Sequence, residues 1–322
     1  MLGVMRAIVV SRFGGPDVLE LVELPTPEPA AGQLRVDVAR VGVGWLDTQI
    51  RAGAGPDVFA VTPPYVPGGA VAGTVTAVGA GVDDAWLGTR VVTKAVSPGY
   101  GGGYADTVIA VPEAAFPVPA ELDLSAALAV LDDGATALAL LEKTPVRDGD
   151  RVLVAPGLGG LGSLLVQMVA ATGATAIAAV RGAEKVATAR ELGVEAVDYS
   201  DPDWPRNIGR RPDVVFEGIG GAMGATALAL LDDGGRFSNY GMASGAPTSV
   251  PEADRGRLTV ADMSQLMEFW PEAARRFKEV LADTAAGRLK PIIGQTYPLA
   301  RAATAHADME ARRFVGKTLL LP

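Results

Sequence analysis

The chain of 322 residues carries a formal net charge of −9, contains no cysteine and is 49% hydrophobic. Its length allows two domains with buried cores, while its acidic balance and lack of a basic block argue against nucleic acid as a partner. The absence of cysteine excludes disulfides, cysteine-ligated zinc and iron–sulfur clusters.

The opening residues, MLGVMRAIVV, do not have the pattern of a secretory signal peptide. No stretch of about 18 apolar residues runs without a charge or a turn residue, so no membrane-spanning segment is expected. We therefore expect a cytoplasmic protein with no membrane partner.

The first part of the chain is predicted to be rich in β-strands. Short runs of Val, Ile and Leu, divided by clusters of Gly and Pro, occupy residues 5–10, 18–24, 33–43, 70–78 and 90–93. Residues 45–52 are predicted to form one or two helical turns. Several short strands at close spacing are typical of a small barrel or sandwich.

The pattern changes near Leu122, where strands and helices begin to alternate. After a helical segment at 123–141, strands are predicted at 150–155, 175–180, 196–198, 212–216 and 235–240, with helices at 160–172, 184–192 and 223–231. This alternation predicts a parallel sheet with helices on both faces. Further helices are expected at 269–288 and 304–312, and a closing strand at 317–321.

A Gly-rich motif follows the first of these strands. Residues 157–162, GLGGLG, match the pattern G-x-G-x-x-G, with glycines at Gly157, Gly159 and Gly162. The pattern alone is weak in a chain with 40 glycines, but here it follows a strand and opens a helix. The glycines permit a tight turn and close backbone approach, and the helix N-terminus attracts phosphate. The motif therefore predicts a dinucleotide site.

The residue after the second strand indicates which dinucleotide binds. Sites for NAD usually place Asp or Glu there, to bind the ribose 2′-hydroxyl. This strand instead ends before Arg181, and Lys185 follows four residues later. A planar guanidinium suits a phosphate group, so the pair favours NADPH, with its additional 2′-phosphate, over NADH.

Five segments together carry a resemblance to a known superfamily. They are VGVGWLDTQIRAG (41–53), PPYVPGGAVAGTVTAVG (63–79), VLVAPGLGGLG (152–162), ELGVEAVDY (191–199) and GGRFSNYGMASG (234–245). The chain resembles zinc-free members of the medium-chain dehydrogenase/reductase superfamily, close to the quinone oxidoreductases. The resemblance implies a GroES-like catalytic domain at 1–122, completed by 262–322, and a Rossmann domain at 123–261. It also implies a homodimer, formed by joining edge strands of the nucleotide domains.

The chain departs from its zinc-dependent relatives at the metal ligands. Gly44 and Trp45 stand where those relatives have a Cys-His pair, and Gly69 and Ala70 stand where they have a Gly-His-Glu element. The single histidine, His306, is expected on the surface. Since zinc needs three or four converging ligands, no metal site is expected.

The chain also departs from the quinone oxidoreductases near the expected substrate pocket. Gly44 replaces an Asn, Gln49 replaces a Tyr and Ala70 replaces an acid, while Asp47 and Arg51 remain. The resemblance therefore supports cofactor binding better than it supports a particular acceptor.

The motif and the resemblance together assign residues to the cofactor. The expected contacts are Thr136, Gly157, Gly159, Gly160, Leu161, Gly162, Arg181, Lys185, Tyr199, Gly218, Ile219, Tyr240, Gly241, Met242 and Lys317. Tyr65, Asp47 and Trp45 are assigned to the substrate pocket. Tyr65 and Tyr104 are candidate hydrogen-bond donors to the acceptor oxygen, and Trp45 and Met242 are candidates for an apolar wall.

The predicted function is an NADPH-dependent, zinc-independent reductase. Without a metal to polarise an oxygen, hydride transfer needs an electron-poor acceptor such as a quinone or an α,β-unsaturated carbonyl. No residue is an obvious general acid, so the proton is expected from solvent or a cofactor ribose hydroxyl. Two alternatives remain open. One is an enoyl reductase of a polyketide or fatty-acyl type pathway, and the other is an NADPH-binding redox sensor with little catalysis.

Overall fold

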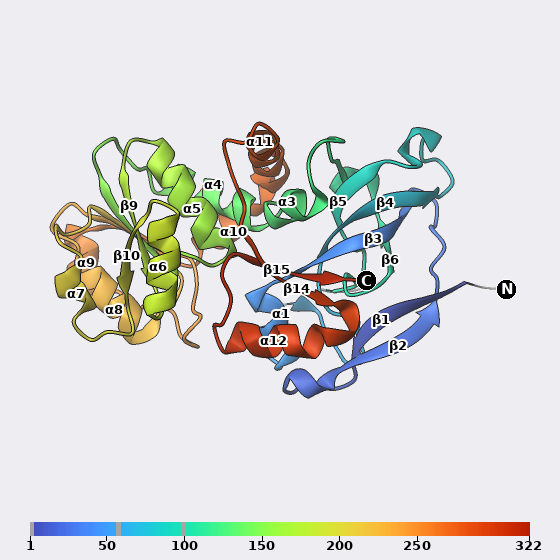
Figure 1. Ribbon diagram of the computed structural model, residues 1–322, viewed down its shortest axis with the longest axis horizontal. Coiled ribbons are helices and arrows are strands. Elements are labelled where there is room, and N and C mark those ends of the chain that lie inside the picture. Colours follow the sequence, from blue (N-terminus) through green and yellow to red (C-terminus); the bar gives the residue numbers. More distant parts are fainter. Residues whose placement is uncertain (1–2, 56–58, 98–100) are drawn as a thin grey trace. The chain divides into compact units, whose positions relative to one another are not determined.

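The computed structural model describes residues 3–55, 59–97 and 101–322 (Figure 1). The chain divides into two compact units. Unit 1 comprises residues Met1–Asp132 and Leu281–Pro322, and unit 2 comprises Asp133–Val280. The fold class predicted from the sequence, a β-rich domain combined with a doubly wound parallel sheet, is confirmed.

Unit 1 is built on antiparallel strands. β1 (Val4–Val10) pairs with β2 (Leu19–Pro25) as a separate two-stranded sheet. A larger sheet has the strand order β14-β15-β3-β4-β5-β7, and β6 pairs with β3. Its strands are β3 (Leu34–Val43), β4 (Ala70–Val78), β5 (Arg90–Lys94), β6 (Thr107–Ala110), β7 (Phe116–Pro117), β14 (Ile293–Pro298) and β15 (Lys317–Leu321).

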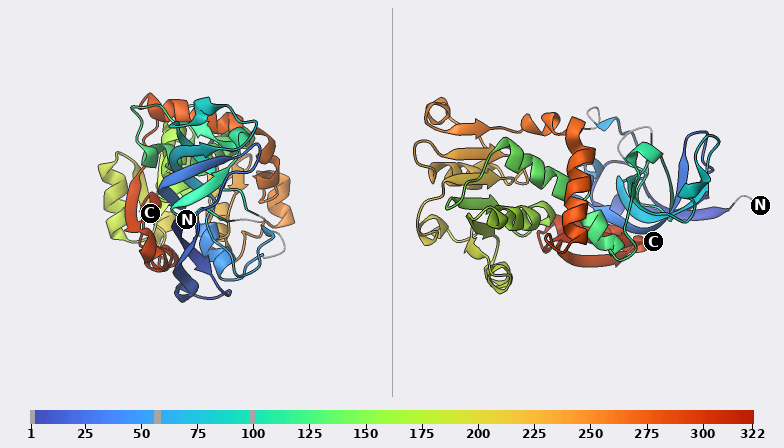
Figure 2. Two further views of the ribbon diagram at one scale, coloured as in Figure 1. Left: turned by 90° about the vertical axis from the view of Figure 1, so that its right-hand side faces the viewer. Right: turned by 90° about the horizontal axis from the view of Figure 1, so that it is seen from above.

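The C-terminal segment completes unit 1. β15 pairs antiparallel with β3, so that strands from the two ends of the chain share one sheet, as the red and blue ribbons in Figures 1 and 2 show. The helices are α1 (Trp45–Arg51), α3 (Leu124–Ala129) and α12 (Ala302–Glu310). α12 contacts α1, which brings side chains near residue 50 against others near residue 306.

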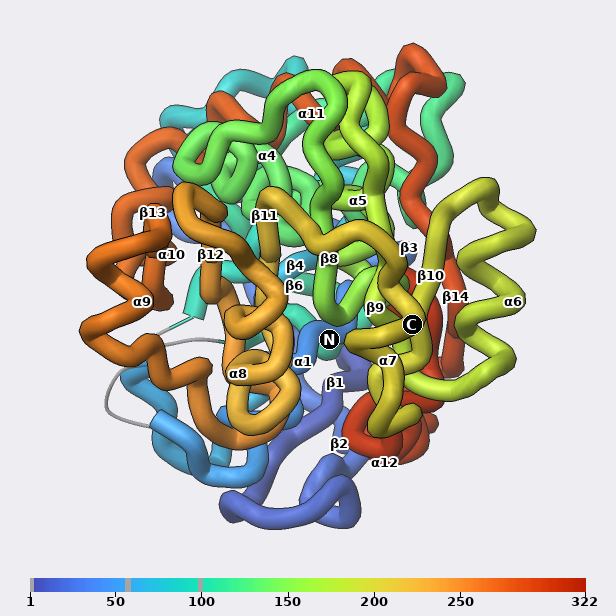
Figure 3. The backbone as a smooth tube through the Cα atoms, turned by 90° about the vertical axis from the view of Figure 1, so that its left-hand side faces the viewer, coloured from blue at the N-terminus to red at the C-terminus, as the bar shows by residue number. Residues whose placement is uncertain are grey.

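Unit 2 contains a parallel sheet of six strands in the order β10-β9-β8-β11-β12-β13 (Figure 3). They are β8 (Arg151–Ala155), β9 (Thr175–Val180), β10 (Glu195–Asp198), β11 (Val214–Glu217), β12 (Arg236–Asn239) and β13 (Thr259–Ala261). The helices are α4 (Asp133–Lys143), α5 (Gly160–Ala171), α6 (Ala183–Glu191), α7 (Trp204–Asn207), α8 (Gly221–Ala229), α9 (Glu252–Arg257) and α10 (Gln265–Glu268). α5 packs on β8 and β9, whereas α8 contacts β11 from the other side of the sheet (Figure 3).

Two expected helices are each divided in the structure. The helix expected at 123–141 is two helices, α3 and α4, because the chain turns at residues 130–132. The helix expected at 269–288 begins only at α11 (Ala273–Ala285), after a 3-10 turn at Trp270–Glu272. Pro271 accounts for the break, since a proline has no N–H to donate and its ring displaces the preceding turn. Strands β6, β7, β13 and β14 were not predicted.

The expected domain boundaries also differ from those of the compact units. The sequence placed them at 122/123 and 261/262, whereas the units divide at 132/133 and 280/281. Ion pairs help to attach residues 262–280 to unit 2. Glu142 on α4 accepts hydrogen bonds from Arg275 at 2.6 Å and Arg276 at 2.7 Å, and both arginines are on α11.

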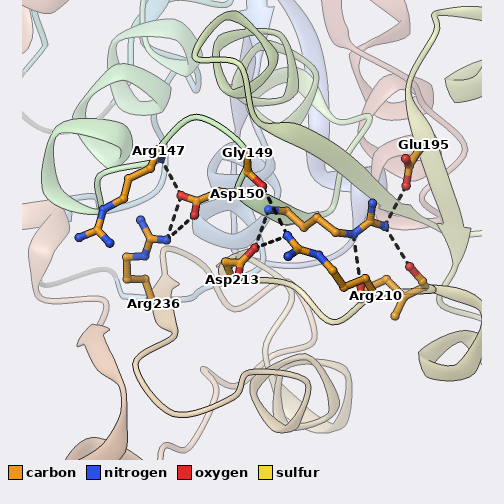
Figure 4. A network of polar contacts seen from close by, with 9 residues as sticks. Arg147, Gly149, Asp150, Glu195, Arg210, Asp213 and Arg236 are labelled. Carbon is orange, nitrogen blue, oxygen red and sulfur yellow. Dashed lines mark hydrogen bonds and ion pairs between the residues drawn. The ribbon is translucent and has the colours of Figure 1, made fainter.

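A network of polar contacts ties together the amino ends of the strands in unit 2 (Figure 4). Asp150, just before β8, receives two hydrogen bonds from Arg236 at 2.8 and 2.9 Å, and the two side chains are each 12% exposed. Asp213, just before β11, accepts from the backbone N–H of Arg151 at 2.8 Å and from Arg210 at 2.8 Å. The network links β8, β11 and β12 at the edge opposite to the Gly-rich turn.

The Asp150–Arg236 pair generates a stability prediction. Asp150→Ala leaves a buried guanidinium without its carboxylate, and breaking such a pair costs about 3 kcal/mol of unfolding free energy. Urea unfolding followed by circular dichroism would measure it. Asp203→Ala is the control, because its partner Arg206 is 84% exposed and the expected change is under about 0.5 kcal/mol. Equal effects of the two variants would contradict the prediction.

Candidate functional site

The carboxyl ends of the parallel strands in unit 2 gather most of the predicted cofactor residues. Arg181 follows β9, Tyr199 follows β10, Gly218 follows β11 and Tyr240 follows β12. The strand order makes the chain reverse direction between β8 and β11, and ligands of doubly wound sheets bind at such a switch point. The Gly-rich turn follows β8 at that position. The sequence predicted these residues one by one, and the sheet brings them to one edge.

The Gly-rich turn is shaped by close contacts that only glycine permits. A Cβ atom on Gly157 would lie 2.5 Å from the Cα of Ala178 on β9, and one on Gly162 would lie 1.9 Å from the carbonyl oxygen of Pro156. The helix α5 begins at Gly160 with Gly159 as its N-cap, and no side chain caps it. The N–H groups of the first turn therefore remain available to an anion. The turn fits the pyrophosphate of a dinucleotide.

A buried carboxylate organises the loops after β11 and β12. Glu217 is 0% exposed and accepts hydrogen bonds from the N–H groups of Ile219 at 2.5 Å and Gly220 at 2.7 Å. Asn239 and Thr248 donate to the same carboxylate at 2.8 and 2.7 Å. Burial raises the pKa of Glu217, although these four hydrogen bonds oppose the shift. The carboxylate thus holds residues 218–220 and the 240s loop in one arrangement.

Tyr240 connects that arrangement to the Gly-rich turn. Its hydroxyl donates to the carbonyl oxygen of Ala155, the last residue of β8, at 3.2 Å. Its ring lies so close to Gly218 that a Cβ there would be 2.5 Å from it. Burial and the nearby charge of Glu217 raise the pKa of Tyr240, which keeps the phenol neutral. Tyr240 therefore serves to fix the loop, while Met242, two residues later, is 36% exposed.

The other side of the edge carries the charged residues. Arg181 is exposed and directly precedes Gly182, the N-cap of α6, and Lys185 lies in the first turn of that helix. Asp198, the last residue of β10, accepts a hydrogen bond from the N–H of Gly182 at 2.8 Å. Sequence reasoning missed Asp198 because it examined only the end of the second strand, whereas this carboxylate ends the third.

Unit 1 contains a buried polar cluster around the predicted pocket residues. Asp47, 2% exposed, accepts hydrogen bonds from the N–H of Gly44 at 2.7 Å and from the hydroxyl of Tyr104 at 3.2 Å. The Tyr104 hydroxyl also lies 2.9 Å from Nε2 of His306. Asp47 thus caps α1 and holds the buried side chain of Tyr104, which in turn contacts His306.

Two expectations about this cluster are wrong. His306 was expected on the surface, but it is 0% exposed, because α12 packs it against α1 and Tyr104. Tyr104 was a candidate donor to the acceptor, but it is also 0% exposed and its hydroxyl is engaged with Asp47 and His306. The sequence carried no signal for this pairing, since about 200 residues separate the two side chains.

The remaining pocket candidates lie in unit 1 as well. Trp45, at the start of α1, is half-buried against the core of that unit. The Tyr65 hydroxyl is buried and makes no hydrogen bond within the described part of the chain, and burial together with the charge of Asp47 raises its pKa to about 12. Arg51, 1% exposed, pairs with Glu310 on α12. Lys317, at the start of β15, is 8% exposed.

Metal ligands and membrane-spanning helices are both lacking in residues 3–55, 59–97 and 101–322. In these ranges no three His, Cys, Asp or Glu side chains converge as a metal site would require. None of the helices here combines the length and the apolar character that a bilayer span needs.

The chain combines a doubly wound sheet, with a Gly-rich turn at its switch point, and a GroES-like β-rich unit. This combination defines the class of two-domain dehydrogenases and reductases. Comparison with protein families agrees. Residues 30–120 match the alcohol dehydrogenase GroES-like domain, and residues 192–320 match the family described as zinc-binding dehydrogenase.

Individual relatives cover the whole chain. A 2-haloacrylate reductase of a Burkholderia species is 33% identical over 99% of both chains, and a quinone oxidoreductase of Pseudomonas aeruginosa is 30% identical over 98% of this chain and 99% of that one. A mycobacterial structure solved with NADPH is 33% identical and superimposes with a TM-score of 0.87 over 99% of this chain and all of the other. The chain belongs to the medium-chain dehydrogenase/reductase superfamily, among the quinone oxidoreductases. It is an oxidoreductase, as the sequence predicted.

The buried state of His306 generates a pH prediction. Burial, with the charge of Arg51, lowers its pKa to about 3, so the unfolded chain binds a proton below pH 6.5 that the folded chain does not. The free energy of unfolding must therefore decrease as the pH is lowered through this range, by about 2 kcal/mol from pH 7 to pH 5. Urea unfolding at both pH values should show this loss in the wild type and not in His306→Gln. Parallel losses in the two proteins would contradict the assignment, since the chain has no other histidine.

Proposed function

We propose that this protein is an NADPH-dependent reductase of quinones or of α,β-unsaturated carbonyl compounds. The observation that carries the proposal is the carboxyl edge of unit 2, where an uncapped helix N-terminus and the cations Arg181 and Lys185 lie at the ends of neighbouring strands. This arrangement suits the two ends of a phosphorylated dinucleotide.

The cofactor is NADPH. The mycobacterial relative and the quinone oxidoreductase of Escherichia coli, which is 28% identical with a TM-score of 0.87 over 99% of this chain, were both solved with NADPH. The first turn of α5 would bind the pyrophosphate, and Arg181, Lys185 and Tyr199 would bind the adenosine end. Thr136, Gly218, Ile219, Gly241, Met242 and Lys317 remain proposed contacts. When bound, NADPH supplies a hydride, and the protein must place the acceptor and exclude water.

The acceptors of two relatives indicate the substrate class. Quinones and 2-haloacrylate share a carbon–carbon double bond conjugated to a carbonyl or carboxyl group. Such a bond accepts hydride at carbon without a metal on the oxygen. The chain has no cysteine and its one histidine is buried against Tyr104, so a histidine–cysteine metal site has no ligands here.

Acrylate-type reduction is a second candidate. It is favoured by the 33% identity to 2-haloacrylate reductase and by the loss of the Asn and Tyr that Gly44 and Gln49 replace. It includes the enoyl reductase that the sequence left open. Loss of NADPH absorbance with a quinone panel and an acrylate and enone panel would rank the two candidates. Binding of NADPH without oxidation by either panel would overturn both.

Tyr65 is the remaining candidate proton donor in the pocket. Its raised pKa keeps the phenol protonated at neutral pH, because burial and the charge of Asp47 outweigh the charge of Arg51, which acts to lower the pKa. The hydroxyl itself is buried. We expect solvent or a cofactor ribose hydroxyl to supply the proton instead. Tyr65→Phe should therefore keep turnover within about tenfold of the wild type, with NADPH affinity unchanged, whereas a loss of about 10³-fold would make Tyr65 the general acid.

The adenosine-end assignment generates a prediction about cofactor choice. Removing the cations in Arg181→Ala/Lys185→Ala takes away the partners of the 2′-phosphate, which NADH lacks. The KM for NADPH should rise at least tenfold while the KM for NADH changes less than threefold. Steady-state kinetics with both cofactors measures this. Arg190→Ala, on the same helix but at its other end, is the matched control and should leave both constants unchanged.

A homodimer is also proposed, through the edge strand β13. Among the residues that the structure describes, this strand is the last of its sheet and pairs with β12 alone. Met267 and Trp270 in the segment that follows are 73% and 63% exposed. An unpaired edge beside exposed apolar side chains suits pairing with a second copy. Light scattering after size-exclusion chromatography should give twice the chain mass of 33.0 kDa, and a monomer at micromolar concentration would contradict the proposal.

A further inference from the structure

The neighbour of Arg181 in space is a carboxylate. Strand β10 lies beside β9 (Figure 3) and pairs with it in parallel. The register sets Asp198 opposite Val180, the residue before Arg181. Asp198 then accepts the N–H of Gly182 at 2.8 Å. The acid that an NAD site carries at the end of its second strand is thus replaced here by one at the end of the third.

The hydrogen bonds of Asp198 all reach one of its two oxygens. Oδ1 accepts from the N–H of Gly182 at 2.8 Å, the N–H of Ser200 at 2.9 Å and the hydroxyl of Ser200 at 2.6 Å. None of these three bonds uses Oδ2. An Asn side chain could therefore keep the same three bonds through its carbonyl oxygen, while the negative charge is removed.

Asp198 is charged under physiological conditions. Burial acts to raise its pKa, but the hydrogen bonds from Ser200 and Gly182 and the charge of Arg181 outweigh that effect and hold the pKa below its usual value. The side chain is half-buried, so its charge is only partly screened by water. A full negative charge therefore lies beside the cation assigned to the cofactor's 2′-phosphate.

We propose that Asp198 is a specificity-determining residue that weakens the preference for NADPH over NADH by opposing the 2′-phosphate. This inference rests on the proposed binding of NADPH at Arg181. The 2′-phosphate carries close to two negative charges, and a carboxylate beside the guanidinium that binds it would repel the phosphate and compete for that guanidinium. NADH has a neutral hydroxyl at the same position, and a carboxylate oxygen can accept a hydrogen bond from it. Asp198 therefore does not oppose the binding of NADH.

The decisive variant is Asp198→Asn, tested with fragments of the cofactor. 2′,5′-ADP carries the 2′-phosphate and 5′-AMP lacks it, so titration calorimetry with each isolates the adenosine end from turnover. Asp198→Asn should bind 2′,5′-ADP about three- to tenfold more tightly and 5′-AMP within about twofold of the wild type. The gain should shrink as ionic strength rises. NADPH over NADH selectivity in kcat/KM should increase by a similar factor.

Two further variants separate charge from structure. Asp198→Ala removes the hydrogen bonds to Gly182 and Ser200 as well as the charge, so it should lower the thermal midpoint where Asp198→Asn does not. Glu191→Gln removes one charge at the far end of α6 and should leave both affinities unchanged. Unchanged or weaker binding of 2′,5′-ADP by Asp198→Asn would overturn the inference and make Asp198 a turn cap only.

The wild type provides the test of the underlying assumption. If it binds NADPH and 2′,5′-ADP but Asp198→Asn binds them no better, the inference about Asp198 fails and the proposed function stands. If the wild type binds neither NADPH nor 2′,5′-ADP, the proposed function fails and the inference fails with it.

Discussion

The parallel pairing of β8 with β11 determines where unit 2 can bind a ligand. β9 and β10 extend the sheet from one side of β8, while β12 and β13 extend it from the other side of β11. The loops after β8 and β11 therefore diverge to opposite faces of the sheet, and ligands of doubly wound sheets bind where the loops diverge in this way. The Gly-rich turn, the loop after β11 and the loop after β12 all depend on this reversal.

Different interactions hold the two sides of the carboxyl edge of this sheet. On the β11 side, Glu217 satisfies two backbone N–H groups, an amide and a hydroxyl without contact to solvent, and Tyr240 ties the result to the end of β8. Because the Glu217 carboxylate accepts four hydrogen bonds, its side chain and the loops that donate to it have one favourable geometry. This side of the sheet is therefore rigid. On the β10 side, Asp198 accepts hydrogen bonds from Gly182 and Ser200, and Arg181 beside it is exposed. Rigid geometry suits the reacting end of a cofactor, and exposed charge suits recognition of a phosphate.

A buried polar cluster holds unit 1 together. Asp47 on α1 binds the hydroxyl of Tyr104, which in turn contacts His306 on α12. Arg51, also on α1, binds Glu310, also on α12. These contacts join α1 to α12 and so attach the C-terminal segment to the N-terminal half of the unit. The buried side chains of His306 and Asp47 thus contribute to packing within unit 1. For this reason we assign no catalytic step to Asp47.

The local pattern of the sequence was sufficient to predict the fold class, the alternation of strands and helices along the chain, and the Gly-rich turn. These features depend on hydrophobic periodicity and on backbone positions that only glycine can occupy, both of which are local. Arg181 was also visible in this way, because it directly follows a strand. Pro271 is also a local signal, because a proline at this position interrupts the helix expected at 269–288.

Only the tertiary structure decided what surrounds these residues. The burial of His306 and Tyr104 requires α12 to pack on α1, a contact between residues about 200 positions apart. The position of Asp198 beside Arg181 requires the register between β9 and β10, and the hydrogen bonds of Glu217 require loops that follow two different strands. A sequence read along the chain shows which charges exist, but strand pairing determines which of them face each other, and that determines how the site distinguishes one nucleotide from another.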